Sequence, residues 1–306
     1  MTRIVVTGGF GYVGGRLVQA LLDENYTVGV STRRTRDRVP DWGKDRVQWG
    51  SDLDALCDGA DCLIHLAAPN ETLATAEPER AISDTIRLTE QAIAAARKAG
   101  VGRFIYFSTV HVYGRLAGHI TEQTPAAPVH PYAIAHLESE QRVRAAADKS
   151  LQALVLRLSN GFGAPADTLA DRWTLLVNDL CRQAVSEGSL TLNSSGRQWR
   201  DFVPLGDVTR AVSFLLKRPQ AAPCDIINLS RGNSMTIRQM AERILDRARL
   251  LVDPEMQLHI VLDDAGPDMP ALVIDNQKLL QTGFRLSVPP EQEIDGLLRF
   301  CRDAWR

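Results

Sequence analysis

The hydrophobic residues of the chain form short apolar runs that alternate with longer segments of helical periodicity. The first run, residues 4–6, predicts a buried strand, and the apolar spacing within residues 13–21 predicts an amphipathic helix directly after it. Later runs predict further strands at residues 26–30, 46–49, 61–66, 103–108 and 151–158. Helices are predicted at residues 85–99 and 131–147. This alternation predicts an α/β fold with a doubly wound parallel sheet.

The pattern changes in the second half of the chain, where loops become longer. Residues 159–200 contain one predicted helix, near 171–185, whereas residues 201–231 return to the sheet pattern. Short helices and turns then alternate to the end of the chain. We therefore predict one domain built on the sheet, formed by residues 1–158 and 201–231, and a smaller mixed α/β C-terminal substrate lobe formed by residues 159–200 and 232–306.

Composition narrows the range of partners. The net charge of -2 gives no basic footprint for nucleic acid or for an anionic membrane. The five cysteines show no C-x-x-C spacing, which argues against a disulfide framework and against a zinc site. No apolar run reaches the roughly 18 residues that a membrane span needs, and a strand starting at residue 4 leaves no room for a signal peptide. We expect a soluble, cytoplasmic protein without a metal.

Glycines interrupt the chain between the first strand and the helix that follows. Gly8 permits a tight turn, Gly11 lets a pyrophosphate approach backbone amides at the helix N-terminus, and Gly14 lets the helix pack on the sheet. An ordinary turn between strand and helix is the alternative. The strand–turn–helix context favours a dinucleotide site. The same turn would add contacts from Phe10, Tyr12 and Val13.

The end of the second predicted strand bears on the choice of dinucleotide. An NAD site usually places an acid there, on the adenosine ribose hydroxyls. This chain has Ser31 there and Arg33 and Arg34 just beyond. Because guanidinium groups suit a phosphate, we expect NADP, with NAD as the alternative. A solvated basic loop also fits, since Arg36 and Arg38 continue the run.

The glycine turn carries a family resemblance. Residues 7–14 read T-G-G-F-G-Y-V-G, which resembles the T-G-x-x-G-x-x-G turn of short-chain dehydrogenases/reductases, and later motifs point to their extended branch, the NAD-dependent epimerase/dehydratase family. The resemblance implies a doubly wound Rossmann sheet. It also implies cofactor contacts from Asp52 and Leu53, after the third strand, and from Leu66, Ala67 and Ala68 in an H-x-A-A turn after the fourth. We interpret His65, which opens that turn, as structural.

The fifth predicted strand ends in a second motif of this family. Residues 108–114 read S-T-V-H-V-Y-G and resemble S-[ST]-x-x-V-Y-G, which implies that the Thr109 hydroxyl hydrogen-bonds the reacting oxygen. Nucleotide-sugar 4,6-dehydratases carry Asp-Glu directly after this residue, for elimination. Val110 and His111 occupy those positions here. Dehydration is therefore the least expected activity of the group.

The most specific motif lies at the start of the helix predicted from residue 131. Residues 131–140 read P-Y-A-I-A-H-L-E-S-E and resemble P-Y-x-x-S-K-x-x-x-E. The resemblance implies that Tyr132 is the catalytic acid/base and that Glu140 is the later acidic residue. The motif's lysine is replaced by His136, which is the main departure from the family.

Electrostatics give the size of that departure. A cation ~4 Å from the Tyr132 phenolate is worth about 4 kcal/mol at an effective dielectric constant of ~20, or roughly three pKa units. A histidine with a pKa of ~6.5 is mostly neutral at cytosolic pH and supplies little of this field. His136 can still bond the nicotinamide ribose. We therefore expect a weaker base at Tyr132, a His136 held protonated by a carboxylate, or chemistry moved to another residue. The alternative to a functional role is that His136 is a partly buried helix residue with a structural hydrogen bond.

Two further matches concern the substrate. Residues 156–163 resemble L-R-x-x-N-x-[YF]-G, which implies that Asn160 faces the substrate. Residues 200–208 resemble R-D-[FY]-[VI]-x-[VI]-x-D-[VL], which implies that Arg200 binds a nucleotide diphosphate. A second departure is acidic: Asp263 and Asp264 stand where related epimerases usually have another phosphate-binding arginine. Either these carboxylates point away or the substrate is not an ordinary nucleotide diphosphate sugar.

The sequence thus predicts an NAD(P)-dependent ketoreductase or other oxidoreductase, or an epimerase, acting on a sugar or nucleotide sugar. An NAD-retaining epimerase is the first alternative. A dinucleotide-binding sensor or scaffold without turnover is the alternative of another class. The resemblance also implies a homodimer, built on the helices at residues 85–99 and 131–147. Alanines on their faces would allow close approach: Ala92, Ala94, Ala95, Ala96, Ala133 and Ala135.

Overall fold

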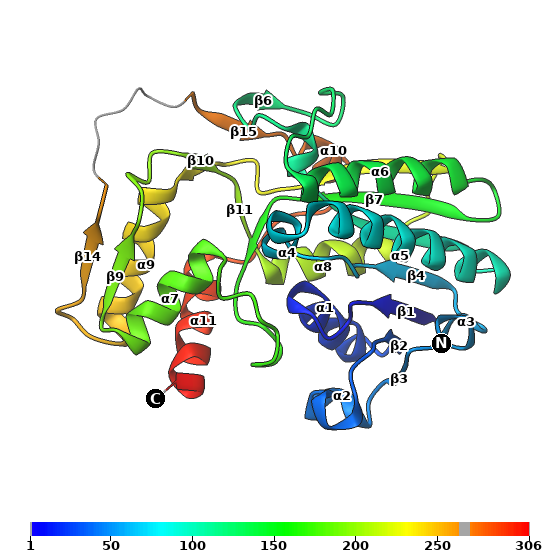
Figure 1. Cartoon of the computed structure of the whole chain (residues 1–306), viewed down its shortest axis with the longest axis horizontal. Coiled ribbons are helices and arrows are strands. Elements are labelled where there is room, and N and C mark those ends of the chain that lie inside the picture. The colour runs from blue at the N-terminus through cyan, green and yellow to red at the C-terminus, as the bar shows by residue number, and fades with distance from the viewer. Residues whose placement is uncertain (1, 263–269, 306) are drawn as a thin grey trace.

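A seven-stranded parallel sheet forms the centre of the protein (Figure 1). The computed structural model describes residues 2–262 and 270–305. The strands of the sheet are β1 (Arg3–Thr7), β2 (Thr27–Ser31), β3 (Gln48–Gly50), β4 (Cys62–His65), β5 (Arg103–Thr109), β7 (Gln152–Leu158) and β12 (Cys224–Leu229). Their order is β12-β7-β5-β4-β1-β2-β3, and all neighbours are parallel. This confirms the predicted doubly wound sheet, in which the order of strand addition reverses between β1 and β4.

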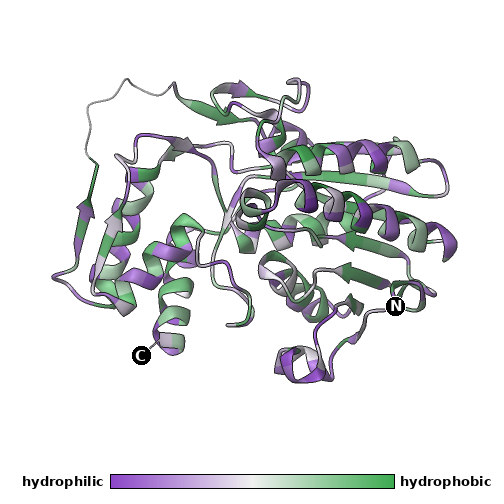
Figure 2. Cartoon of the chain, in the orientation of Figure 1, coloured by the Kyte–Doolittle hydropathy of each residue, from purple (hydrophilic) through white to green (hydrophobic). Residues whose placement is uncertain are grey.

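Helices cover both faces of this sheet. On one face, α1 (Tyr12–Asp23) packs beside α8 (Leu205–Leu216); on the other lie α3 (Leu53–Cys57), α5 (Pro78–Lys98) and α6 (Pro131–Ala146). Successive residues of β1 therefore all enter a core, which explains its unbroken apolar run. Ile4 and Val6 pack with α1 and α8, whereas Val5 packs with Ala92 of α5. Figure 2 shows the apolar strands enclosed by helices with hydrophilic outer faces.

A second hydrophobic cluster lies beside the sheet. It is built by α7 (Leu176–Ser186), α9 (Ile237–Leu251) and α11 (Pro290–Trp305), with the two-stranded pair β9 (Ser189–Leu192) and β14 (Gln257–Ile260) (Figure 1). Leu180, Met240 and Leu297 are buried in it. The predicted helix near residues 171–185 begins only at Leu176, and the Asn178 side chain donates to the backbone carbonyl of Arg172 in the turn before it. The exact division of the chain into domains stays a prediction.

Short elements complete the chain. The two-stranded pairs are β6 (Gly118–Ile120) with β15 (Leu272–Ile274), β8 (Asn160–Phe162) with β11 (Phe202–Pro204), and β10 (Trp199–Arg200) with β13 (Met235–Thr236). The remaining helices are η1 (Arg36–Arg38), α2 (Asp41–Lys44), α4 (Glu71–Ala76), η2 (Val110–Tyr113) and α10 (Gln277–Gln281). Within the described ranges, no helix is both long and apolar enough to cross a bilayer.

The alanines that were expected on the outer faces of the two helices are mostly buried. Among the six alanines, only Ala94 is exposed. The other five are at most 2% exposed and pack inside the single chain: Ala92, Ala95, Ala96, Ala133 and Ala135. On the outside of α5 and α6, Arg142 bridges Glu90 and Glu138. The packing argument for a dimer was therefore wrong, and the homodimer itself stays a prediction.

Candidate active site

The glycine turn joins β1 to α1 at the point where the sheet order reverses. Gly8 has φ +71°, a conformation that favours glycine, and its carbonyl oxygen accepts from the Gly11 amide at 2.9 Å. A Cβ on Gly14 would collide with that same carbonyl. Gly11 caps α1 without a side-chain acceptor, so the first amides of α1 stay available to an anion. This geometry fits a pyrophosphate.

The three non-glycine residues of the turn play different parts. The Phe10 ring packs against Trp42, with centroids 5.6 Å apart, and is almost fully buried. Its side chain lines neither cavity described below, so the predicted Phe10 contact is wrong for the side chain and leaves only its backbone. Tyr12 and Val13 both line the cavity above the turn. The Tyr12 hydroxyl donates to the Gly163 carbonyl at 2.9 Å, which joins the turn to the strand end beyond β8.

Two neighbouring cavities lie along the carboxyl ends of the strands. The central cavity, of about 400 Å³, is lined by Gly8, Gly11, Gly14 and Leu66 together with the predicted catalytic residues. The outer cavity, of about 1060 Å³, extends over β2 and β3. Both are lined by Gly8, Ala67 and Ala68. An elongated ligand can therefore run from one cavity into the other over the glycine turn.

The outer cavity gathers the residues predicted for the adenosine end. Its lining includes Ser31, Arg33, Arg34, Asp52 and Leu53. Asp52 also caps α3 by accepting from the Ala55 amide at 3.0 Å. The Arg34 guanidinium donates to the backbone carbonyl oxygen of Leu169 at 3.4 Å. The Arg33 guanidinium is exposed and has no hydrogen bond within the described part of the chain, so it remains available to a ligand phosphate.

His65 lines the outer cavity, and both of its ring nitrogens are in use. Nδ1 bonds the Thr7 hydroxyl at 2.6 Å, and Nε2 bonds the Thr89 hydroxyl at 3.3 Å. Burial lowers the pKa of His65 to about 3, so it is neutral. These contacts support the structural interpretation of this histidine.

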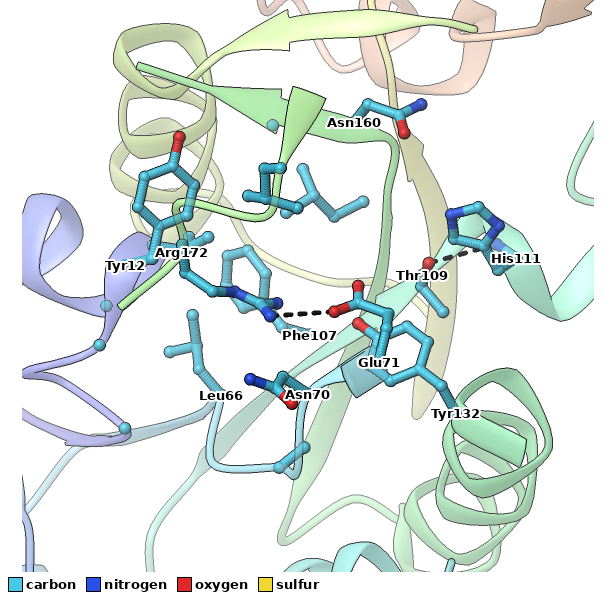
Figure 3. A pocket seen from close by; sticks show the side chains of 18 of the residues that line it. Tyr12, Leu66, Asn70, Glu71, Phe107, Thr109, His111, Tyr132, Asn160 and Arg172 are labelled. Carbon is cyan, nitrogen blue, oxygen red and sulfur yellow. Dashed lines mark hydrogen bonds and ion pairs between the residues drawn. The ribbon is translucent and has the colours of Figure 1, made fainter. Parts of the chain in front are cut away.

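The central cavity brings together residues from separate strands and helices (Figure 3). Thr109 ends β5, Tyr132 and His136 lie one turn apart on α6, and Asn160 begins β8. All four line this cavity. The Thr109 hydroxyl oxygen accepts from the His111 amide at 3.2 Å, which leaves its own proton for an oxygen in the cavity.

Tyr132 and His136 are both uncharged. Burial lowers the pKa of His136 to about 4, and the opposing effect of the Glu71 carboxylate is smaller. The pKa of Tyr132 is raised by burial and, next, by Glu71. No carboxylate hydrogen-bonds His136 among the described residues, so the alternative of a His136 held protonated by a carboxylate is not supported, and the weaker base at Tyr132 stays a prediction. His136 bonds Tyr106 through Nδ1 at 2.8 Å, whereas its buried Nε2 has no partner within the described residues.

An ion pair that the sequence did not reveal crosses the central cavity. The Arg172 guanidinium lies 2.9 Å from the Glu71 carboxylate, and Figure 3 shows the pair beside Tyr132. Burial raises the pKa of Glu71, but Arg172 and hydrogen bonds outweigh it and leave the pKa below its usual range. Glu71 follows the H-x-A-A turn, and this position at a strand end is the one sequence signal that could have identified it.

The predicted substrate residues are only partly brought to the cavity. Asn160 lines it, and its amide nitrogen donates to the Asp201 carbonyl at 2.8 Å, whereas its amide oxygen has no partner among the described residues. Arg200 does not line it, although its charge is close enough to lower the pKa of His111, after burial as the main cause. Asp201 is buried and accepts from the Arg231 and Gly232 amides, as expected for a structural residue.

Two further acidic positions were singled out in the sequence: Glu140, and the pair Asp263 and Asp264. Glu140 forms a buried ion pair with Arg157 at 2.6 Å and accepts from the Ser108 hydroxyl at 2.5 Å, beneath the cavity floor. Its role here is to hold α6 against β5 and β7. Asp263 and Asp264 lie outside the described residues.

The fold and the two cavities together define an enzyme of the Rossmann type. The family described as the NAD dependent epimerase/dehydratase family matches residues 4–230, and the chain belongs to this family of extended short-chain dehydrogenases/reductases. His136 remains a departure from the tyrosine–lysine motif within it.

Individual relatives are distant but match the chain over its length. The low-salt glycan biosynthesis protein Agl12 of Haloferax volcanii is 26% identical, over 99% of this chain and 98% of that protein. The UDP-glucose 4-epimerase of Azospirillum brasilense is 25% identical, over 97% of this chain and 90% of its own. A structure of UDP-glucuronic acid 4-epimerase from Bacillus cereus, with UDP-glucuronic acid and NAD, has a TM-score of 0.82 at 21% identity and covers 99% of this chain and 100% of that one. At this identity it shows a shared fold.

Proposed function

We propose that the protein is an NAD(P)-dependent oxidoreductase that reduces a ketone, or oxidises a hydroxyl, on a nucleotide-linked sugar. One observation carries this proposal. Thr109, Tyr132 and His136 line one cavity together with the glycine turn, and His136 Nε2 has no partner in the part of the chain that the structure describes. A hydroxyl donor, an acid and a ribose ligand beside a pyrophosphate cradle suit redox chemistry at a carbon–oxygen bond.

The residues present fit a nicotinamide dinucleotide. The glycine turn would bind the pyrophosphate, the outer cavity would hold the adenosine half, and His136 Nε2 would bond a hydroxyl of the nicotinamide ribose. When bound, such a cofactor supplies or accepts a hydride. The chain itself orients the sugar oxygen through Thr109 and exchanges the proton of that oxygen through Tyr132.

The protonation state of Tyr132 favours ketone reduction. A neutral phenol is ready to give its proton to a carbonyl oxygen as that oxygen gains negative charge, whereas oxidation requires the phenolate. Burial and the Glu71 carboxylate raise the pKa of Tyr132 by more than the nearby Arg172 charge lowers it, because Arg172 is paired with Glu71, and His136 is neutral. Solvent then restores the phenol proton for the next turnover.

NADP is our preferred cofactor, because Arg33 is free to meet a ribose phosphate in the outer cavity. A second candidate is an epimerase that retains NAD. It is favoured by the solved relatives, whose structures were determined with NAD and with UDP-glucose or UDP-glucuronic acid. We also propose that the protein works as a homodimer.

The proposal is tested first by identifying small molecules released on denaturation, by mass spectrometry. Titration with NADPH and NADH follows. The protein is then incubated with UDP-glucose, UDP-glucuronic acid and a 4-keto sugar nucleotide. Net consumption of NADPH with the ketone supports the reductase. Epimerised sugar with no net change in a retained NAD supports the epimerase. Failure to bind either dinucleotide would overturn both.

A matched pair of variants separates enzyme from sensor. Tyr132→Phe removes the proposed acid, whereas Tyr113→Phe removes a buried phenol hydroxyl that bonds Asn228 at 2.6 Å outside the cavity. Loss of turnover in the first variant alone supports catalysis. A wild-type protein that binds dinucleotide and is inert with all the sugars would support a sensor instead.

A further inference from the structure

His136 has one unused ring nitrogen at the edge of the central cavity. The residue is 5% exposed, and its buried Nε2 has no hydrogen-bond partner within the described residues. Buried polar atoms without a partner are uncommon in folded proteins. Because the His136 ring lines the central cavity, the missing partner is expected to be a ligand that enters it.

Tyr106 lies directly behind His136 and holds its other nitrogen. The phenol hydroxyl is 2.8 Å from His136 Nδ1, and both residues are buried. The Tyr106 ring also stacks on His65, with centroids 5.8 Å apart and planes at 23°. Tyr106 is thus fixed between the imidazole of His65, which opens the H-x-A-A turn, and the imidazole of His136, which lines the central cavity.

We propose that Tyr106 is a positioning residue that fixes the tautomer of His136, so that Nε2–H donates into the central cavity. In this arrangement the phenol donates to Nδ1, and the single imidazole proton resides on Nε2. The tautomer is argued from the Tyr106–Nδ1 contact and from the chemistry of the two groups, and it does not depend on the ligand. The identity of its acceptor, a ribose hydroxyl of the dinucleotide, rests on the proposed function.

The chemistry of the two groups decides the direction of the hydrogen bond. Burial raises the pKa of the Tyr106 phenol, so it keeps its proton, and the lowered pKa of His136 leaves one proton on the ring. The position of that proton depends on the hydrogen bond at the other nitrogen. The Ser139 and Thr89 hydroxyls also lie near the Tyr106 oxygen and can donate to it. Because a phenol is the stronger donor and an imidazole nitrogen a stronger acceptor than a hydroxyl, the Tyr106 O–H donates to Nδ1.

This arrangement separates two tasks that one ammonium group performs in the tyrosine–lysine motif. Nε2–H can bind a hydroxyl, but it carries no charge that would lower the pKa of Tyr132. The protein would thereby keep the ribose contact and still hold Tyr132 as an acid. His136 can act directly on Tyr132, because the two rings meet edge-on with their centroids 4.5 Å apart.

Nuclear magnetic resonance of the free protein tests the tautomer without any cofactor. Long-range ¹H–¹⁵N spectra of histidine-labelled protein report which nitrogen is protonated, and His136→Gln assigns the signal. We expect only the Nε2–H form in the wild type and a mixture of both forms in Tyr106→Phe. A wild-type Nδ1–H form, or a spectrum unchanged by Tyr106→Phe, would overturn the proposal.

Binding of NADPH and NADH provides the second readout. Tyr106→Phe should weaken the tighter of the two by about five- to tenfold, the effect of one hydrogen bond. The control Tyr113→Phe loses a buried phenol hydrogen bond to Asn228 and should leave binding unchanged. In a His136→Lys background the Tyr106→Phe effect should vanish, because an ammonium has no tautomer. Persistence of the effect in that background contradicts the proposal.

The two readouts separate this inference from the proposed function. If neither dinucleotide binds the wild type, the proposed function fails, and the spectra still decide the tautomer. If dinucleotide binds but the spectra show Nδ1–H, the tautomer inference alone fails.

Discussion

The ring of His136 meets the ring of Tyr132 edge-on, with centroids 4.5 Å apart and planes at 67°. The two residues lie one turn apart on α6, at the spacing of the family's tyrosine–lysine pair. Because burial keeps His136 neutral, the position that carries a cation in that motif carries an uncharged donor here. Burial and, next, the Glu71 carboxylate raise the pKa of Tyr132 without a cation at position 136 to oppose them, and the pH dependence of the enzyme should reflect this.

Replacing His136 by lysine should restore a base at Tyr132. A cation beside the phenol lowers its pKa, by roughly one to three units. For His136→Lys we expect retained or higher activity with a pH optimum at lower pH, measured from pH–rate profiles of alcohol oxidation. His136→Gln, which keeps a neutral donor, is the control and should leave the optimum unchanged. An optimum unmoved by lysine would contradict this account of His136.

Glu71 should act on Tyr132 in the opposite direction. Its carboxylate raises the pKa of Tyr132 and pairs with Arg172. Glu71→Gln removes the negative charge and frees the guanidinium, so the pKa of Tyr132 should fall by about one unit. The oxidation rate near pH 7 should then rise, by up to about tenfold. Glu90→Gln, which breaks a surface pair with Arg142, is the matched control. A fall in the phenolate-dependent rate at pH 7 would show that Glu71 acts otherwise.

Cofactor preference should depend on a single side chain of the loop after β2. Arg33→Ala should weaken NADPH binding by about 10- to 100-fold, the range expected for lost charge-assisted contacts, and leave NADH binding unchanged. Arg36→Ala is the control, because Arg36 begins η1 three residues further on and does not line the outer cavity. Calorimetric titrations of both variants with both dinucleotides make the measurement. An equal loss for NADPH and NADH in Arg33→Ala would refute the phosphate contact.

Acid should destabilise the protein partly through His136. Its folded pKa, about 4, lies below the unfolded value of ~6.5, so the unfolded state binds a proton first as the pH falls. Stability from this residue is present above pH ~6.5 and is lost toward pH 4, at up to about 1.4 kcal/mol per pH unit. The His136→Gln variant has no imidazole to protonate, so its stability should not fall for this reason in acid. Urea unfolding of both proteins at pH 7 and pH 4 should show their stability difference change by about 3 kcal/mol in favour of the variant. A constant difference would mean that His136 titrates normally in the folded protein.

Local patterns in the sequence predicted the parts of the site that one segment builds. The glycine turn needs only Gly8, Gly11 and Gly14 between a strand and a helix, and the structure has that turn. The pairing of Tyr132 with His136 follows from helical spacing. The parallel sheet follows from the alternation of apolar runs with helices, because a strand covered on both faces is apolar throughout.

Other features depend on which face of a helix or turn is buried, and the sequence pattern did not predict that face. Phe10 points into the core against Trp42, although its neighbours Tyr12 and Val13 line the central cavity. Ala92 and Ala133 pack inside the chain, because α5 and α6 bury their small residues between helix and sheet.

The Glu71–Arg172 pair lay beyond sequence reasoning for a related reason. Its partners are 101 positions apart and come from a short helix and an irregular loop. The orphaned Nε2 of His136 could also be found only from the packing around it.

The central claim is that Tyr132 donates a proton while a hydride reaches a carbonyl carbon of a nucleotide-linked sugar. Reduced dinucleotide deuterated at the nicotinamide C4, mixed with a 4-keto sugar nucleotide, tests it most directly, with mass spectrometry of the sugar. We predict a deuterated alcohol with the wild type and, for Tyr132→Phe, a rate lower by about 10²- to 10⁴-fold with unchanged dinucleotide affinity. Equal deuterium transfer by the two proteins would contradict the role of Tyr132 and, with it, the proposed mechanism.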